Sequence, residues 1–229
     1  MTQRMCRGPA ILAVGLALLT LQACGDQGRQ GIFLPLAARL VPAVGDLAGV
    51  EDPAAGAIAR PGFTPAEIAA NLTGFQYVGV PTMGPPVPAR LVQNNGARQT
   101  WDVQVGFTVA FDDGMLVATR GLGGDLMGAN TTEVRAALNA GGGQATRLHD
   151  YLDGMDQVVT ESFACEIVAQ GTEEIDLGLR RATLAKFSET CRNARVEFEN
   201  LYWLDDRGQV LSSRQYVSRT VAYLRNNRL

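Results

Sequence analysis

Between residues 101 and 111 the sequence alternates between apolar side chains and polar or small ones. Every odd position is apolar: Trp101, Val103, Val105, Phe107, Val109 and Phe111. A repeat of two places successive side chains on opposite faces of an extended chain, so this run predicts a strand with one buried face. Gly106 lies inside the run and is a point at which it could divide into two short strands.

The same kind of reasoning predicts a mostly antiparallel β protein with two or three short helices. Asp112-Asp113-Gly114 and residues 205–208 are typical turns between strands, the first of which makes a hairpin with residues 115–120. Thr64-Pro65-Ala66-Glu67 has the pattern of a capping box, and residues 130–133 predict a second helix start. Further strands are expected at residues 75–80, 147–151, 157–169, 195–204 and 210–223.

The first 24 residues have the features of an export signal. Arg4 and Arg7 precede an apolar run over residues 10–21, which is too short to span a bilayer core of roughly 30 Å. The run ends in Leu21-Gln22-Ala23-Cys24, the pattern of a bacterial lipoprotein signal. We therefore predict cleavage before Cys24 and attachment of acyl chains (palmitate among them) to this residue, which would anchor the protein stably. A plain secretory signal with a coincidental cysteine is the alternative.

Three parts of the chain follow from this prediction. They are a signal peptide (1–23), a lipidated N-terminus with an irregular tether (24–62), and a single β-rich domain (63–229). Gly25 after the lipidated cysteine favours the outer membrane, with the domain facing the periplasm. The formal net charge of −3 argues against nucleic acid as a partner, because nucleic-acid binding requires a basic face.

Two cysteines remain once the signal has been removed and Cys24 lipidated. Cys165 and Cys191 would then face an oxidising compartment, where a disulfide is the favoured outcome. A redox pair would favour the spacing Cys-x-x-Cys, and a metal site would favour nearby histidines, whereas His149 is the single histidine of the chain. No metal and no cofactor is therefore expected.

Several segments together resemble the group 4 capsule polysaccharide lipoprotein family of the YjbF/GfcB type. The segments are Met115–Met127 (MLVATRGLGGDLM), Tyr151–Gly154 (YLDG), Cys165, Cys191, Asn200–Asp206 (NLYWLDD), Gly208 and Ser213–Gln215 (SRQ). The resemblance runs from about Thr64 to the C-terminus. It implies an outer-membrane lipoprotein that assists export or assembly of a capsule or exopolysaccharide. It also implies an antiparallel sheet curved into a partly open barrel or sandwich, with helices against it.

The sequence offers little catalytic chemistry of its own. His149 falls in an alternating stretch at a position expected to be a polar surface site, and no nucleophile accompanies it. Asp112-Asp113 and Asp205-Asp206 could be carboxylate pairs for glycoside hydrolysis, but the adjacent glycines favour turns. Gly121-Leu-Gly-Gly lacks the Lys-Ser/Thr of a phosphate loop. No enzyme activity is expected.

Basic and aromatic residues near the C-terminus are the candidates for polymer contact. Arg214 and Arg219 could bind acidic groups of a polysaccharide, while Trp203 and Tyr216 could stack on sugar faces. The ordinary alternative places the aromatic residues in the β core and the arginines on an edge strand.

Three functions remain open at this point. The favoured one is a non-enzymatic accessory in capsule or exopolysaccharide export, which is held at the membrane by its lipid and contacts polysaccharide or other export proteins. An envelope carrier for an apolar, lipid-like ligand is the alternative, and it would need a large empty apolar cavity. A glycan hydrolase is third, because it requires two convergent carboxylates about 5–9.5 Å apart.

Overall fold

The chain is described by a computed structural model, and the description covers residues 62–229. Two α-helices and one short 3-10 helix fall in this range: α3 (Pro65–Ala70), η1 (Leu72–Gly74) and α4 (Thr132–Asn139). The first strands are β1 (Phe75–Gly79), β2 (Val87–Asn95), β3 (Arg98–Val103), β4 (Phe107–Asp112), β5 (Met115–Arg120) and β6 (Gly128–Asn130). The others are β7 (Gly142–Leu152), β8 (Val158–Asp176), β9 (Arg181–Arg192), β10 (Glu197–Leu204), β11 (Val210–Ser218) and β12 (Ala222–Arg228).

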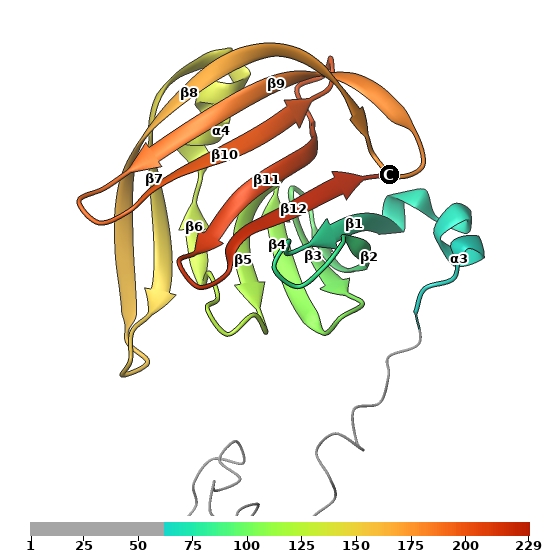
Figure 1. The fold of residues 1–229 in the computed structure, drawn as a ribbon, viewed down its shortest axis with the longest axis horizontal. Helices are drawn as coiled ribbons and strands as arrows, with labels where there is room; N and C mark the ends of the chain where they lie inside the picture. Colours follow the sequence, from blue (N-terminus) through green and yellow to red (C-terminus); the bar gives the residue numbers. More distant parts are fainter. Residues whose placement is uncertain (1–61) are drawn as a thin grey trace, which may run out of the picture. The chain divides into compact units, whose positions relative to one another are not determined.

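All these strands belong to one antiparallel sheet, which curls until it nearly closes into a barrel (Figure 1). Its order is β5-β4-β3-β2-β1-β12-β11-β10-β9-β8-β7-β6. Most consecutive strands are joined by hairpins, but β5 and β6 lie at opposite ends of this order and α4 lies between β6 and β7. The last strand, β12, pairs with the first, β1. The C-terminal strand is therefore an interior strand with partners on both sides.

The two edge strands, β5 and β6, meet along a seam, where the end of β5 bonds to residues 126 and 127 just before β6. The backbone N–H of Thr119 donates to the carbonyl of Leu126 at 2.9 Å, and the Thr119 hydroxyl accepts from the Leu126 N–H at 3.0 Å. The Arg120 guanidinium donates across the seam to the carbonyls of Leu126 and Met127, both at 3.1 Å. These bonds satisfy edge groups that would otherwise pair with another chain.

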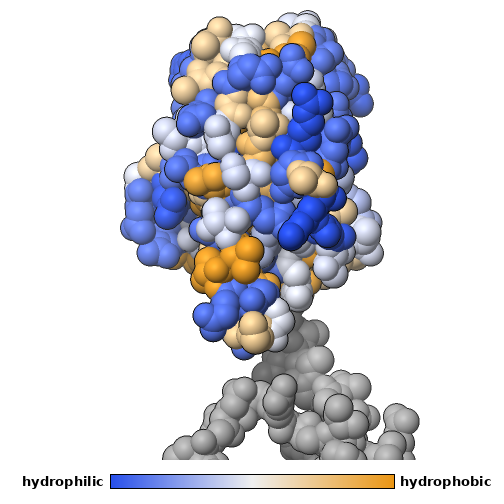
Figure 2. Space-filling view, turned by 90° about the vertical axis from the view of Figure 1, so that its left-hand side faces the viewer, coloured by the Kyte–Doolittle hydropathy of each residue, from blue (hydrophilic) through white to orange (hydrophobic). Residues whose placement is uncertain are grey.

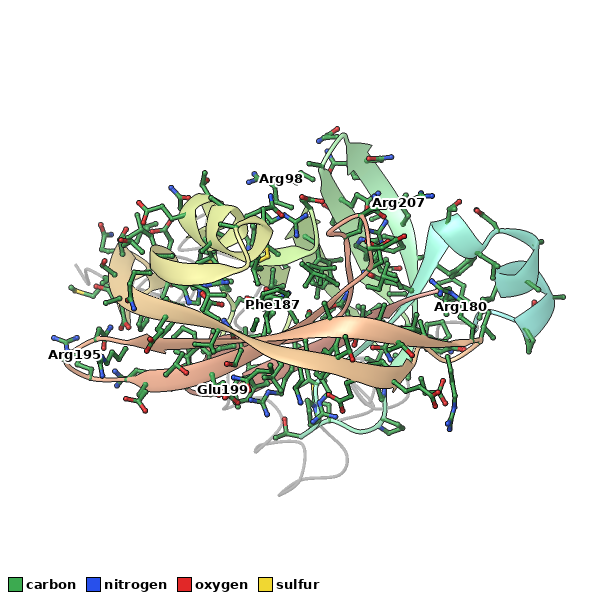
Figure 3. The ribbon with its side chains drawn as sticks, turned by 90° about the horizontal axis from the view of Figure 1, so that it is seen from above. Arg98, Arg180, Phe187, Arg195, Glu199 and Arg207 are labelled. Carbon is green, nitrogen blue, oxygen red and sulfur yellow. A yellow bond between two sulfur atoms is a disulfide. The ribbon has the colours of Figure 1, made fainter. Side chains whose placement is uncertain are left out.

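Apolar side chains fill the inside of the curled sheet. One cluster joins α4 to the long strands β8–β10 through residues such as Val134, Phe163 and Phe198, and a second lies between β1–β5 and β11–β12. In Figure 3, Phe187 lies on the side of the sheet that faces α4, and Glu199 lies on the opposite side. The interior is therefore packed, and odd-numbered residues of β10 point outward.

The fold class predicted from the sequence is confirmed. Trp101, Val103, Phe107, Val109 and Phe111 are buried as the alternation requires. Residues 104–106 form a turn that divides the run into β3 and β4, so Val105 is 56% exposed instead of buried. The Asp113-Gly114 turn is present as well, with a positive φ at both residues.

Several strand predictions were missing or wrong. No strand was predicted at β2, although its N–H groups pair with β1 and β3. Residues 210–223 are not one strand: the chain turns after Ser218 and starts β12 at Ala222, which has a positive φ of 62°. β8 extends to Asp176, well past the predicted end at Ala169, and β9 was not predicted.

A disulfide joins Cys165 to Cys191 at directly paired positions of β8 and β9, with Cα atoms 4.0 Å apart. The pairing expected from the cysteine count is therefore present. The predictions for residues 1–61, including the signal peptide, Cys24 and most of the tether, fall outside the described residues. Within the described part, no helix has the length and apolar character to cross a membrane.

Candidate functional site

A groove on the outer face of the sheet contains two of the predicted contact residues. It has a volume of about 330 Å³ and is lined by residues of β1, the end of β8 and β10–β12, including Tyr77, Asp176, Trp203, Ser212, Arg214 and Arg225. We call it the Trp203 groove. Its floor is formed by outward-pointing residues of neighbouring strands, because Trp203 is paired with Ser212 and Arg214 with Arg225.

The indole of Trp203 is held in a fixed orientation. Its Nε1–H donates to Glu173 at 3.1 Å, and the ammonium of Lys186 lies 5.6 Å from the ring centroid. Lys186 also forms an ion pair with Glu173 at 2.8 Å, and the hydrogen bonds from Lys186 and Trp203 lower the pKa of that carboxyl. A half-buried indole held by two neighbours is suited to stack on a flat ligand with little loss of side-chain entropy.

The end of the β8–β9 hairpin forms one wall of this groove. Leu177 is fully buried and packs with Leu184 and Leu211, and Trp203 is part of the same cluster. The Asn227 side chain donates to the carbonyl of Asp176 at 3.3 Å, which ties the wall to β12. In Figure 3 the labelled Arg180 marks this end of the hairpin, and Arg195 marks the opposite end of the long strands.

The other two predicted contact residues lie in a different groove. It has a volume of about 500 Å³, sits among the turns that follow β5, β7 and β11, and is lined by residues that include Tyr151, Asp153, Asp156, Glu161, Tyr216 and Arg219. We call it the Tyr216 groove. Tyr216 is only 7% exposed and stacks on Phe198 with ring centroids 4.3 Å apart, so most of its face is already used.

Arg219 and the turn beside it are exposed. Arg219 forms no hydrogen bond or ion pair with any residue of the range 62–229, in contrast to Arg214, which pairs with Glu199 at 3.0 Å. The β7–β8 turn next to the groove exposes an apolar patch, visible at the lower end of the domain in Figure 2, that comprises Leu152, Met155, Val158 and Val159. The four predicted contacts are therefore split, with Trp203 and Arg214 in one groove and Tyr216 and Arg219 in another.

A buried polar cluster inside the sheet was not predicted. Its members are Arg147, His149, Glu189, Asn200, Tyr202 and Gln215, each fully buried. Arg147 donates to both carboxylate oxygens of Glu189, at 2.9 and 3.0 Å, and Tyr202 and Asn200 donate to the same carboxylate at 2.6 and 2.7 Å. Burial is the largest single influence and lowers the pKa of the Arg147 guanidinium. The charge and hydrogen bond of Glu189, together with Tyr202 and Tyr151, outweigh it, so the pKa lies above its usual value.

His149 belongs to this cluster, so the prediction of a polar surface position was wrong. The hydroxyl of Tyr151 donates to the carbonyl of Val217 at 2.7 Å, so His149 Nδ1 must carry the proton that it donates to that hydroxyl at 2.9 Å. The Nε2 atom is then free to accept from Arg147 at 3.4 Å. The imidazole is a neutral structural group in this network, held between the Tyr151 hydroxyl and the Arg147 guanidinium.

Stability should therefore depend on pH through His149. Burial and the charge of Arg147 lower the pKa of His149 well below its unfolded value of about 6.5. The unfolded chain thus binds one more proton between these two pKa values, so the stability present above pH 6.5 falls as the pH drops below it. We expect the wild type to lose up to ~1.4 kcal/mol per pH unit more than His149→Gln between pH 6 and pH 5.

Urea unfolding at pH 7.5, 6 and 5 would measure this difference. His149→Gln removes the titrating group, so the two curves of unfolding free energy against pH should diverge below pH 6.5. Parallel curves would show that His149 does not titrate on unfolding.

The carboxylate pairs act as turn residues. Asp205 accepts the N–H groups of Arg207 and Gln209 at 3.0 and 2.8 Å, and Asp113 forms an ion pair with Arg135 at 2.8 Å. Asp125 accepts from the N–H groups of Gly121 and Leu122, which closes the glycine-rich bend. The turn interpretation of these segments agrees with the structure.

Within residues 62–229, one cluster has ligand types suited to a metal, but its chemistry does not support a metal site. Cys165, Glu189 and Cys191 bring ligand atoms within 4.8 Å of one another. Both sulfurs belong to the disulfide and cannot bind a metal as thiolates. Glu189 already accepts hydrogen bonds from Arg147, Asn200 and Tyr202.

Comparisons with known proteins agree with the fold described above. A search of curated proteins finds no match. The crystal structure of the hypothetical lipoprotein YmcC from Escherichia coli (K12) has the same fold, with a TM-score of 0.57 and 16% sequence identity over 73% of this chain and 96% of that one. The model of the YjbF family, described as group 4 capsule polysaccharide lipoprotein gfcB, YjbF, matches residues 57–229. The chain therefore belongs to the YjbF family of group 4 capsule polysaccharide lipoproteins.

Proposed function

We propose that this protein is an outer-membrane lipoprotein, anchored through Cys24, that assists export or assembly of a capsule or exopolysaccharide without catalysing a reaction. The proposal further assigns contact with the polymer to the Trp203 groove. The family supplies the link to capsule polysaccharide. The apolar patch at the β7–β8 turn is then available to other export proteins, because exposed apolar patches are typical of interaction surfaces.

One observation carries the assignment of the groove. Trp203 and Arg214, which lie on different strands, meet on one open surface where the indole is already held by Glu173 and Lys186. An aromatic platform beside polar side chains is the common way in which proteins hold a sugar ring, since the ring stacks and its hydroxyls form hydrogen bonds. The alternative, a carrier for an apolar ligand, is less well supported because core side chains and the buried polar cluster fill the inside of the sheet.

Complementation of a deletion strain would test the proposal. We expect wild type to restore both surface and released polysaccharide, and Cys24→Ser to fail because the protein loses its anchor. Trp203→Ala should reduce polymer output, whereas Arg195→Ala, at the opposite end of the long strands (Figure 3), should act as wild type.

The outcomes separate the two halves of the proposal. Unchanged polysaccharide in the deletion strain would contradict the role in export and favour the apolar-ligand carrier. Full complementation by Trp203→Ala, at wild-type protein levels, would instead contradict the assignment of the groove.

A further inference from the structure

We infer that the Trp203 groove recognises an acidic saccharide, with a sugar ring on Trp203 and a carboxylate of the same polymer on Arg225. The inference rests on the proposed function, because it names the class of polymer that the groove would bind. Arg225 was not one of the four predicted contacts; its position in the groove makes it a candidate.

Arg225 lies where two hollows of the surface meet. It lines the Trp203 groove and also a second hollow of about 330 Å³, which is formed by Gly79 and the proline-rich loop before β2. Pro86 lines both hollows as well. The combined surface is an open trough, which suits a segment of polymer better than a single small molecule.

The proline-rich loop is a close-fitting wall of this trough. Gly79 is the cross-strand partner of Arg225, and a Cβ atom at Gly79 would lie only 2.7 Å from the Cα atom of Pro86. The glycine thus allows the loop to pack directly against β1. Arg225 therefore has no side chain opposite it on β1, and its guanidinium stays exposed.

The charges around Arg225 leave it open to an anion. Arg225 is paired directly with Arg214, and two like charges at such positions repel each other. The charge of Arg214 is compensated by Glu199 at 3.0 Å, and its guanidinium lies over Tyr223 at 4.7 Å. Arg225 forms no ion pair within residues 62–229, so an anion bound there would relieve the repulsion.

The two acids that line the groove, Glu174 and Asp176, have partners within the protein. Glu174 forms an ion pair with Arg181 at 3.0 Å. Asp176 accepts the N–H of Gly178 at 2.8 Å, which organises the turn at the end of the hairpin. A guanidinium binds a carboxylate through two parallel hydrogen bonds, so a polymer that contains uronic acids is the sugar chemistry that best fits a groove lined by both Arg225 and Trp203.

Titration calorimetry with the full-length protein in detergent would test the inference, with a hexamer of galacturonic acid as probe and maltohexaose as its neutral counterpart. We expect the acidic hexamer to bind the wild type at least 10-fold more tightly than the neutral one, and more weakly as salt is added. Arg225→Gln should weaken binding of the acidic hexamer by about 10- to 100-fold, since hydrogen bonds to charged groups contribute ~1.5–3 kcal/mol. The matched control Arg195→Gln removes an exposed arginine at the opposite end of the long strands and should change the affinity less than 2-fold.

Each contrary result has a distinct meaning. Equal binding of both hexamers that is lost in Trp203→Leu would overturn the acidic class and leave the groove as a polymer site. Unchanged affinity of Arg225→Gln, or no detectable binding of the acidic hexamer, would overturn the inference. Circular dichroism spectra equal to that of the wild type would show that each variant is folded.

Discussion

Replacing Glu189 by alanine is expected to destabilise the protein by about 3–5 kcal/mol, because it leaves the Arg147 guanidinium charged and unpaired in the interior. The side chains of Arg147 and Glu189 are 1% and 0% exposed, so water cannot compensate for the lost partner. Tyr202 and Asn200 would lose their acceptor at the same time. An effect of this size approaches the total stability of many domains.

Urea unfolding of three variants would measure this effect and its cause. Arg147→Met combined with Glu189→Leu should recover part of the stability, since it removes both charges together but still leaves Tyr202 and Asn200 without their acceptor. The exposed pair between Arg181 and Glu174 is the matched control, and Glu174→Ala should change stability by less than about 1 kcal/mol. A loss below 1 kcal/mol for Glu189→Ala would show that the buried pair adds little.

The sequence predicts the strands of this fold best where one face is apolar and the other polar. Residues 101–111 satisfy that condition, and their buried face is the one that the alternation indicates. The outer half of the β8–β9 hairpin does not, because Gly171 to Glu174 has no apolar side chain on either face and forms strand through pairing with β9. β2 was missed for a related reason. The prolines before it suggest a loop, and it forms a strand because it pairs with β1 and β3.

The buried polar cluster shows why the interior was harder to predict than the fold. In β7 the inward positions are occupied by Arg147 and His149, so a rule that places polar residues outside assigns the wrong face. The neighbouring strand β8 indicates the buried face of β7 correctly. Arg147 pairs with Phe163, and Phe163 shares the apolar, buried face of β8 with Cys165 and Ile167. The pairing of β7 with β8 had to be known before that signal could be applied.

The sequence indicated which residues could contact a polymer, but not which of them lie together in the fold. Trp203 and Arg214 were selected from the sequence, and the structure brings them together in one groove. Tyr216 and Arg219 were selected on the same grounds, but they lie near other turns. Which of these residues share a groove depends on the register of β10 with β11 and on the irregular pairing after Tyr216. Local sequence determines neither of them.

Removing the disulfide is expected to lower the stability by about 3–4 kcal/mol, because Cys165 and Cys191 close a loop with a sequence separation of 26. In the chain-entropy model this contribution arises in the unfolded state, which becomes less restricted when the bridge is absent. Guanidinium unfolding of Cys165→Ala/Cys191→Ala would measure the loss. Unfolding of the wild type with and without dithiothreitol provides a second measurement in which no side-chain volume is removed.

Because this stabilisation arises in the unfolded state, the disulfide should have little influence on the folded β8–β9 hairpin. β8 and β9 stay paired on both sides of the bridge, from Ala164 with Arg192 to Asp176 with Arg181, so the reduced protein should keep the hairpin that walls the Trp203 groove. Binding of a ligand in that groove under native conditions should therefore change less than 2-fold on reduction. A large loss of affinity together with a small loss of stability would instead mean that the bridge holds the folded hairpin in position, and the stabilisation would then belong to the native state.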